Sequence, residues 1–60
     1  MTLYIAGEDI KAGRAVICGP DGKLYAPGSV NGTMVAVAEE NIREGLRVAI
    51  KFGQAREDDA

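Results

Sequence analysis

The stretch AGEDIKAGRAVIC at residues 6–18 returns as AEENIREGLRVAI at residues 38–50, an offset of 32 positions (38 − 6). Conservative replacements fill several of the remaining positions. In a chain of 60 residues, this match predicts one supersecondary unit used twice. The identical positions, given as first-copy and second-copy residues, are Ala6/Ala38, Glu8/Glu40, Ile10/Ile42, Gly13/Gly45 and Val16/Val48.

Each position of the unit has a physical role, described here for the first copy. Asp9 is a residue type that caps one helical turn or forms an Asx turn. Ile10 is the large apolar residue of an otherwise polar turn, so we expect it in the core. Gly13 is predicted at positive φ, where the chain reverses into the next strand. The second copy repeats these three positions as Asn41, Ile42 and Gly45.

The segments around the two turns have the patterns of short strands. Residues 2–6 alternate, and we expect Leu3 and Ile5 to face the core with Tyr4 outward. Residues 14–26 are predicted to form a hairpin, because GPDG at residues 19–22 has strong turn chemistry. Residues 27–32 are predicted to form a polar, glycine-rich loop.

The second half predicts two further strands, at residues 33–38 and 46–52. In the first of these, Val35 and Val37 are expected to face the core. In the second, alternation places Leu46, Val48, Ile50 and Phe52 on one face. The predicted fold is therefore all-β, a small barrel or rolled antiparallel sheet of about five short strands, built from two pseudo-symmetric strand-turn-strand repeats. Residues 1–53 are predicted to form one domain, followed by a flexible acidic tail at residues 54–60.

The composition limits how stable the chain can be on its own and which kinds of partner it can bind. A chain this short buries only roughly 60% of its unfolded surface, and small domains usually need disulfides, metals or partner subunits. One cysteine and no histidine are present, so we expect association with other subunits. The formal net charge of −2 comes from interspersed charges, which argues against direct nucleic-acid binding. No apolar run has the length of a membrane span, and the N-terminus lacks a signal-like pattern, so synthesis in the cytoplasm is expected.

Residues that could carry chemistry have simpler structural interpretations. Cys18 has no histidine to activate it, and is interpreted as a small buried apolar residue. The acidic pairs at residues 8–9 and 39–40 lack the spacing of a calcium loop and are interpreted as solvated turn residues. We therefore predict no catalytic, cofactor or metal site, and no enzymatic activity.

Contact with a partner protein is the remaining functional interpretation. Tyr4 and Tyr25 are placed on the outward phase of their strands, either as ordinary surface residues or as partner contacts. The acidic tail is a second candidate for partner contact, through a basic patch on the partner. Its candidate residues are Arg56, Glu57, Asp58 and Asp59.

The segments AGEDIKAGRAVICGPDGKLYAPG and VAVAEENIREGLRVAIKFG resemble the small decoration, or cement, proteins of tailed-bacteriophage capsids. The shared pattern is a strand, D-I-x-x-G, V-x-I and D-G-K-x-Y, then V-A-x-A, N-I-x-x-G and V-x-I, over about residues 3–53. The resemblance implies a small β-barrel virion protein on the capsid exterior. It also implies binding to the assembled shell of major capsid protein, often as trimers.

Two functions from different classes therefore remain open. The first is a structural virion protein that stabilises the phage shell, as a homo-oligomer (a trimer is favoured) or as many copies on the shell. The second is a small cytoplasmic β-barrel adaptor or binding module, SH3-like and in one version associated with nucleic acid.

Overall fold

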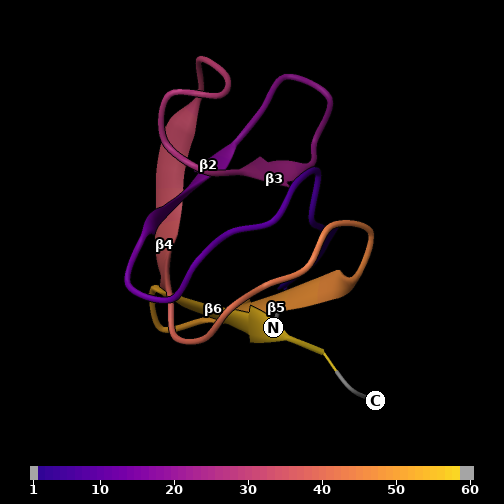
Figure 1. The fold of residues 1–60 in the computed structure, drawn as a ribbon, viewed down its shortest axis with the longest axis vertical. Helices are drawn as coiled ribbons and strands as arrows, with labels where there is room; N and C mark the ends of the chain where they lie inside the picture. Colours follow the sequence, from indigo (N-terminus) through magenta and orange to yellow (C-terminus); the bar gives the residue numbers. More distant parts are fainter. Residues whose placement is uncertain (1, 59–60) are drawn as a thin grey trace.

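The computed structural model describes residues 2–58 and is built from strands and turns (Figure 1). No helix occurs among these residues, which confirms the predicted all-β class. The strands are β1 (Thr2–Ile5), β2 (Ala15–Cys18), β3 (Leu24–Tyr25), β4 (Thr33–Ala38), β5 (Arg47–Lys51) and β6 (Gln54–Glu57).

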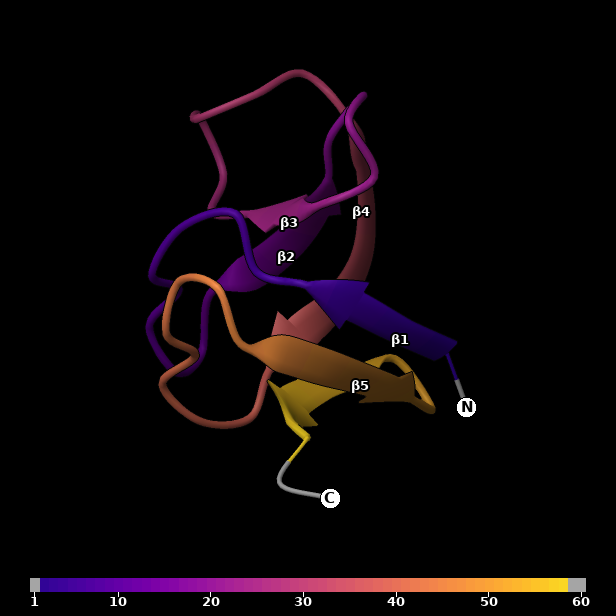
Figure 2. The same cartoon turned by 90° about the vertical axis from the view of Figure 1, so that its right-hand side faces the viewer.

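The six strands form one strongly curled sheet in the order β1-β5-β6-β4-β2-β3. Figure 2 shows β1 lying along β5, with β2, β3 and β4 on the other half of the molecule. All neighbouring strands are antiparallel except β4 and β6, which are parallel. The predicted small rolled sheet of short strands is confirmed, and the structure adds a sixth strand and one parallel pair.

The two copies of the repeat are related as a pseudo-twofold pair. The first copy supplies β1, β2 and β3, and the second supplies β4, β5 and β6. Each copy's first strand pairs with the second strand of the other copy, as β1 with β5 and β4 with β2. The third strand of each copy then meets its own first strand in parallel, at Ala6–Leu24 and at Ala38–Ala55. The two copies of the repeat are therefore joined to each other through their strands.

The two isoleucines of the turns meet at the centre of this arrangement. The N–H of Ile10 donates to the carbonyl oxygen of Ile42 at 2.8 Å, and the reverse bond is 2.7 Å. Both side chains are 1% exposed. The prediction that these residues fill the core is confirmed. Because the turns bond to each other, neither copy can form this arrangement alone.

The caps of the two turns also cross between the copies. The Asp9 carboxylate accepts from the N–H of Glu44 at 2.8 Å, and the Asn41 side-chain oxygen accepts from the N–H of Ala12 at 2.9 Å. We expected each side chain to cap its own turn. That expectation is wrong for these bonds, because the turns face each other and bring the opposite backbone within reach.

The glycines at the end of each turn have the predicted backbone conformation. Gly13 has a φ of 86° and Gly45 a φ of 85°. A Cβ added at either position would meet nothing within 4 Å. Any cost of substitution there therefore comes from the backbone conformation and not from a clash.

This distinction gives a testable expectation at Gly45. Gly45→Val should lower the free energy of unfolding by about 1–2 kcal/mol, the cost of a left-handed conformation for a residue with a Cβ. Gly45→Asn is the matched control and should lose less, because asparagine tolerates this region. Urea denaturation of the three proteins measures the difference. Equal losses in both variants would mean that φ is not the cause.

In β1, the face that points inward is the one opposite to the predicted face. Tyr4 packs against the core, whereas Leu3 and Ile5 are 47% and 39% exposed. The neighbouring Ala6 is buried at 1%, and residues two apart share a face. Tyr4 is therefore carried inward with Ala6, and the expectation of an outward Tyr4 is wrong.

A similar correction applies to β4. Its buried residues are Ala36 and Ala38, while Val37 is 39% exposed. Val35 is half-buried and packs against the core, as expected. The inward face of β4 thus carries small side chains, and larger residues such as Ile10, Leu24 and Ile42 fill the core beside them. Hydrophobicity alone pointed to the larger valines.

The end of the chain differs most from the expectation. Residues 54–57 were predicted to lie in a flexible tail, but they form β6 between β5 and β4. Ala55 is fully buried in the core. Asp58 continues the strand contact, since its N–H donates to the carbonyl oxygen of Arg47 at 2.9 Å. The predicted domain boundary at residue 53 is thus too early, and Asp59 and Ala60 lie outside the described residues.

Candidate protein-binding surface

The hairpin between β5 and β6 turns through two residues, Phe52 and Gly53. Their φ angles are 54° and 75°. A two-residue hairpin with both φ values positive is the geometry for which Asn-Gly is preferred. Phenylalanine is unfavourable at such a position because its Cβ crowds the backbone. Phe52 thus occupies a site that its own conformational preference disfavours.

The side chain of Phe52 is also almost fully solvated. It is 90% exposed, the largest exposure among the bulky apolar residues described. We predicted that Phe52 would extend the inward face of the last strand, and this is wrong because the strand ends at Lys51. The turn rotates residue 52 out of the alternation.

A shallow groove of about 410 Å³ lies beside Phe52 on the outer surface of β5 and β6. Ala49 is an outward residue of β5, yet it is only 6% exposed because its neighbours cover it. We call this region the Phe52 surface. It is lined by Glu39, Ala49, Lys51, Phe52, Gln54 and Arg56.

Charged groups surround the apolar centre of the Phe52 surface. Arg56 donates to the carboxylate of Glu39 at 2.8 Å. The Lys51 ammonium lies 5.4 Å from the centroid of the Phe52 ring, a cation–π contact. An exposed aromatic residue with a polar rim is the usual composition of a protein-binding surface.

Tyr25, the other tyrosine considered as a partner contact, makes its contacts within the chain. The Tyr25 ring lies against Gly7 and Gly19, where an added Cβ would come within 2.5 Å and 2.8 Å of it. Its hydroxyl donates to the Asp21 carboxylate, which lowers the pKa of Asp21 and raises the pKa of Tyr25. Tyr25 is half-buried and serves to hold the GPDG turn.

The predicted contact residues of the C-terminal segment do not act together. Arg56 lies on the Phe52 surface, and Asp58 lies beside β5. Glu57 accepts hydrogen bonds from Arg43, from its backbone N–H at 2.8 Å and its Nε at 3.2 Å. Asp59 lies outside the described residues. The segment is therefore bound to its own domain as far as residue 58.

The bond between Glu57 and Arg43 gives stability a pH dependence. The side-chain and backbone hydrogen bonds from Arg43 lower the pKa of Glu57 below its usual 4.5. A lowered pKa in the folded state stabilises the protein above about pH 4.5, and this contribution is lost as pH falls through the folded value. We expect the urea midpoint to fall with acidification in this range.

Glu57→Gln should show a smaller fall in the urea midpoint over the same range, because glutamine does not ionise. Glu40→Gln is the matched control, since the Glu40 side chain is exposed in the second turn. Its acid dependence should follow that of the unchanged protein. Identical pH profiles for all three proteins would contradict the assignment.

The residues that could carry chemistry make structural contacts. Cys18 is half-buried, and its thiol lies 3.8 Å from the carbonyl oxygen of Gly19. The Glu8 carboxylate accepts from the N–H of Ala26 at 2.8 Å, joining the first turn to the end of the hairpin. Residues 2–58 contain no cluster of three metal-ligating side chains from His, Cys, Asp and Glu. These residues also form no helix that could span a bilayer.

Comparisons with protein-family models, with curated proteins and with solved structures gave no match. The identification of the Phe52 surface as a binding surface therefore rests on its geometry. A sequence signal for it exists in Lys51-Phe-Gly-Gln54, where a glycine follows a strand pattern at two-residue hairpin spacing. Phenylalanine favours strands, so residue 52 was assigned to the preceding strand and the turn was not predicted.

Proposed function

We propose that this chain is a structural virion protein that binds and stabilises an assembled phage capsid shell, with the Phe52 surface as its contact. The shell is the partner that the sequence resemblance implies. The observation that supports binding is Phe52 itself, which combines a left-handed backbone with 90% exposure.

Both properties of Phe52 oppose the stability of the isolated domain. A left-handed conformation costs a non-glycine residue about 1–2 kcal/mol. Solvation of the ring also forgoes the roughly 1.5–3 kcal/mol that burial of such a side chain provides. An aromatic anchor entering a pocket on a partner would recover the second amount. Local strain that lacks a reason within the fold is typical of functional positions.

Binding energy alone would produce the stabilisation. A module that contacts neighbouring shell subunits raises the free energy needed to separate them by its own free energy of association. Many copies on one shell, or an oligomer that contacts several subunits, would add avidity. The mixed charges around Phe52 would set orientation and partner choice more than affinity.

The test substitutes Phe52 by asparagine. Asparagine is favoured at this hairpin position, so Phe52→Asn should keep or raise the urea midpoint of the free protein. Its binding to shells assembled from the major capsid protein of the same genome should fall at least tenfold in co-sedimentation. Met34→Thr is the matched control, since Met34 is 55% exposed and lies outside the groove lining.

Three results would count against the proposal. The unchanged protein could fail to sediment with shells, or Phe52→Asn could bind as tightly as the unchanged protein. Retention of a soluble protein or a nucleic acid, with no affinity for shells, would instead favour the adaptor function. A folded Phe52→Asn protein that has lost shell binding, beside a Met34→Thr protein that has kept it, would support the proposal.

A further inference from the structure

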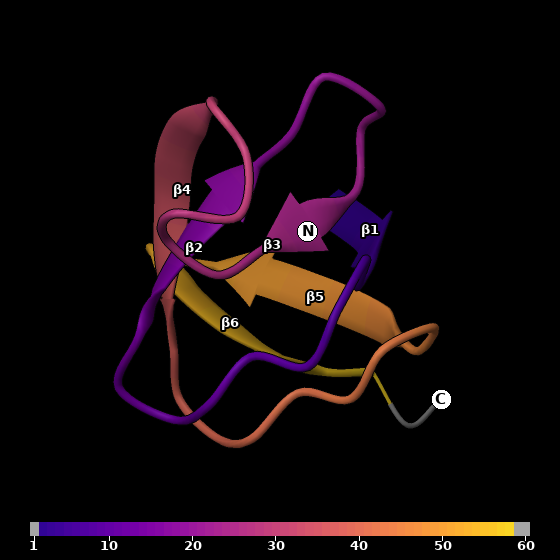
Figure 3. The ribbon, with the colours of Figure 1, turned by 45° about the horizontal axis from the view of Figure 1, so that its top comes forward.

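In the sheet formed by residues 2–58, strand β1 is an edge strand that is paired on one side only. Its partner is β5, while its other side faces β3, the opposite edge of the sheet. Figure 3 shows these two edges facing each other across the curl of the sheet. They are joined at one end, where the N–H of Gly7 donates to the carbonyl oxygen of Leu24 at 2.7 Å.

The hydrogen bonds of Ala6 show which backbone groups of β1 face the open side. Ala6 donates to the carbonyl oxygen of Leu46 at 3.0 Å and accepts from the N–H of Gly45 at 2.8 Å, so its backbone faces the β5 side. Residues alternate along an antiparallel strand. The backbone groups of Leu3 and Ile5 therefore point away from β5. By this alternation, the N–H groups of Leu3 and Ile5 lie on the side of β1 that no strand of residues 2–58 pairs with.

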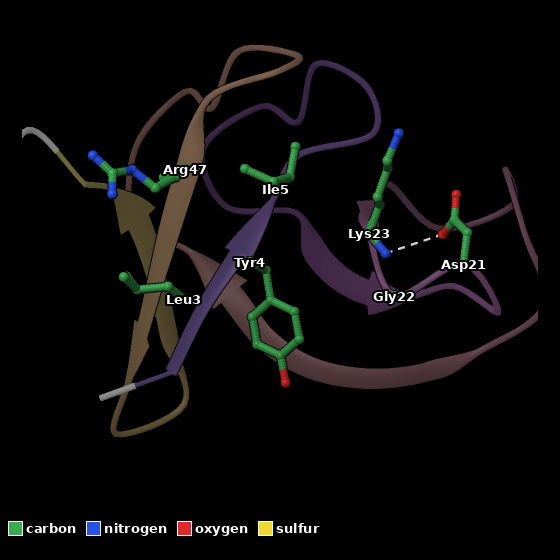
Figure 4. Close-up of a pocket in the computed structure, with 7 residues that line it drawn as sticks. All are labelled: Leu3, Tyr4, Ile5, Asp21, Gly22, Lys23 and Arg47. Atoms are coloured by element: carbon green, nitrogen blue, oxygen red, sulfur yellow. Dashed lines mark hydrogen bonds between the residues drawn. The ribbon is translucent and has the colours of Figure 1, made fainter.

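The second copy of the repeat shows what closes such an edge. Its equivalent of Ile5 is Val37 (37 − 32), whose N–H donates to the carbonyl oxygen of Gly53 at 2.9 Å. Among residues 2–58, no corresponding bond joins Ile5 to the turn before β3. A pocket of about 400 Å³ lies there, between β1 and the turn before β3 (Figure 4). Its lining is Leu3, Tyr4, Ile5, Asp21, Gly22, Lys23 and Arg47.

The sequence of β1 offers no protection against pairing. The strand reads TLYI, with β-branched, aromatic and aliphatic residues and with neither charge nor proline. Natural proteins usually shield an open edge with a charge, a proline or a bulge. Here Leu3 and Ile5 also expose 47% and 39% of their surface. An unprotected apolar edge of this kind is suited to a further strand.

We propose that the further strand is β1 of a second copy of this chain. The two strands would run antiparallel about a twofold axis at Tyr4, so that Leu3 of each copy lies opposite Ile5 of the other. In this register the N–H of Ile5 donates to the Leu3 carbonyl oxygen of the other copy. The N–H of Leu3 donates to the Ile5 carbonyl oxygen of the other copy. The pocket beside β1 provides space for the incoming strand.

Self-complementarity favours a second copy over an unrelated strand. The two outward residues of β1 lie two positions apart, so the same pair of residues matches itself when one strand is reversed. Cross-strand neighbours would then cover the exposed Leu3 and Ile5 side chains. β1 carries no charge that would repel its copy. A twofold axis closes the assembly at a dimer, in contrast to the trimer implied by the sequence resemblance.

A proline substitution separates edge pairing from other kinds of association. Leu3→Pro removes an N–H that points away from β5, so it costs no bond within the domain and is tolerated on an edge strand. It should leave the far-UV circular dichroism unchanged and abolish the dimer. Leu3→Thr keeps the N–H and introduces a β-branched side chain that suits a strand, and should still dimerise, with weaker affinity. Sedimentation velocity over a concentration series measures all three full-length proteins.

A dimer in the unchanged protein that Leu3→Pro converts to a monomer would support the proposal. A monomer at every concentration, a trimer, or a dimer that survives in folded Leu3→Pro would overturn it. If Leu3→Pro does not fold, hydrogen exchange of the unchanged protein replaces it. Protection of the Leu3 and Ile5 amides should then rise with protein concentration, and constant exchange at these amides would overturn the proposal. The outcome is independent of shell binding.

Discussion

Replacing both Ile10 and Ile42 by alanine is expected to leave the protein unfolded at 25 °C. Each side chain is 1% exposed, and Ile→Ala at a buried site costs about 2–5 kcal/mol. A small domain has a total stability of only about 5 kcal/mol. The two residues are bonded through their backbones, so the double loss is expected to differ from the sum of the single losses.

Urea denaturation of the two single variants, with circular dichroism of the double variant, measures this effect. Leu46→Ala is the matched control, because Leu46 follows the second turn but is 37% exposed. It should lose much less stability than either isoleucine variant. Losses below half a kcal/mol in both isoleucine variants would contradict the central role of these residues in the core.

Removal of residues 54–60 is the second change with a large expected effect. The truncated chain should fail to fold, because β6 bonds to β5 on one side and to β4 on the other. Its Ala55 is fully buried, and its loss would open the core to water. Circular dichroism and sedimentation should show a disordered chain.

Removal of residues 59–60 alone is the control, since it leaves every strand contact of the described residues in place. That protein should fold with a nearly unchanged urea midpoint. Ala55→Asp provides an independent test, because it keeps the full length and places a carboxylate in the core. A folded protein after removal of residues 54–60 would show that β6 is dispensable. Because truncation should destroy the fold, it cannot be used to test the segment as a partner contact.

Local sequence chemistry determined the parts of this fold that depend on a few neighbouring residues. The pattern D-I-x-x-G at Asp9–Gly13, which returns as N-I-x-x-G at Asn41–Gly45, predicted both buried isoleucines and both positive-φ glycines. These features follow from local causes, namely one apolar side chain in a polar turn and one backbone conformation that favours glycine. The GPDG turn of residues 19–22 was predictable for the same reason, and its Gly22 N–H donates to the Gly19 carbonyl oxygen at 3.0 Å.

Tertiary structure decided which face of each strand is buried. Alternation in β1 defined two faces, and hydrophobicity favoured the face with Leu3 and Ile5, and not the face with Tyr4, as the buried one. The pairing of β1 with β5 set the opposite phase, which buries Ala6 and turns Tyr4, on the same face, against the core. In the same way, the pairing of β4 with β2 placed Ala36 inside and left Val37 partly exposed.

The candidate surfaces depended most on tertiary contacts. Gln54–Glu57 is polar and acidic in sequence, and only the neighbouring strands supply the bonds that make it β6. Phe52 becomes an exposed residue because β6 returns beside β5 through a two-residue turn. The sequence by itself therefore determined the repeat, its turns and the all-β class. The burial phase, the sixth strand and the exposed aromatic residue depended on long-range pairing, because their energies come from residues that are distant in the chain.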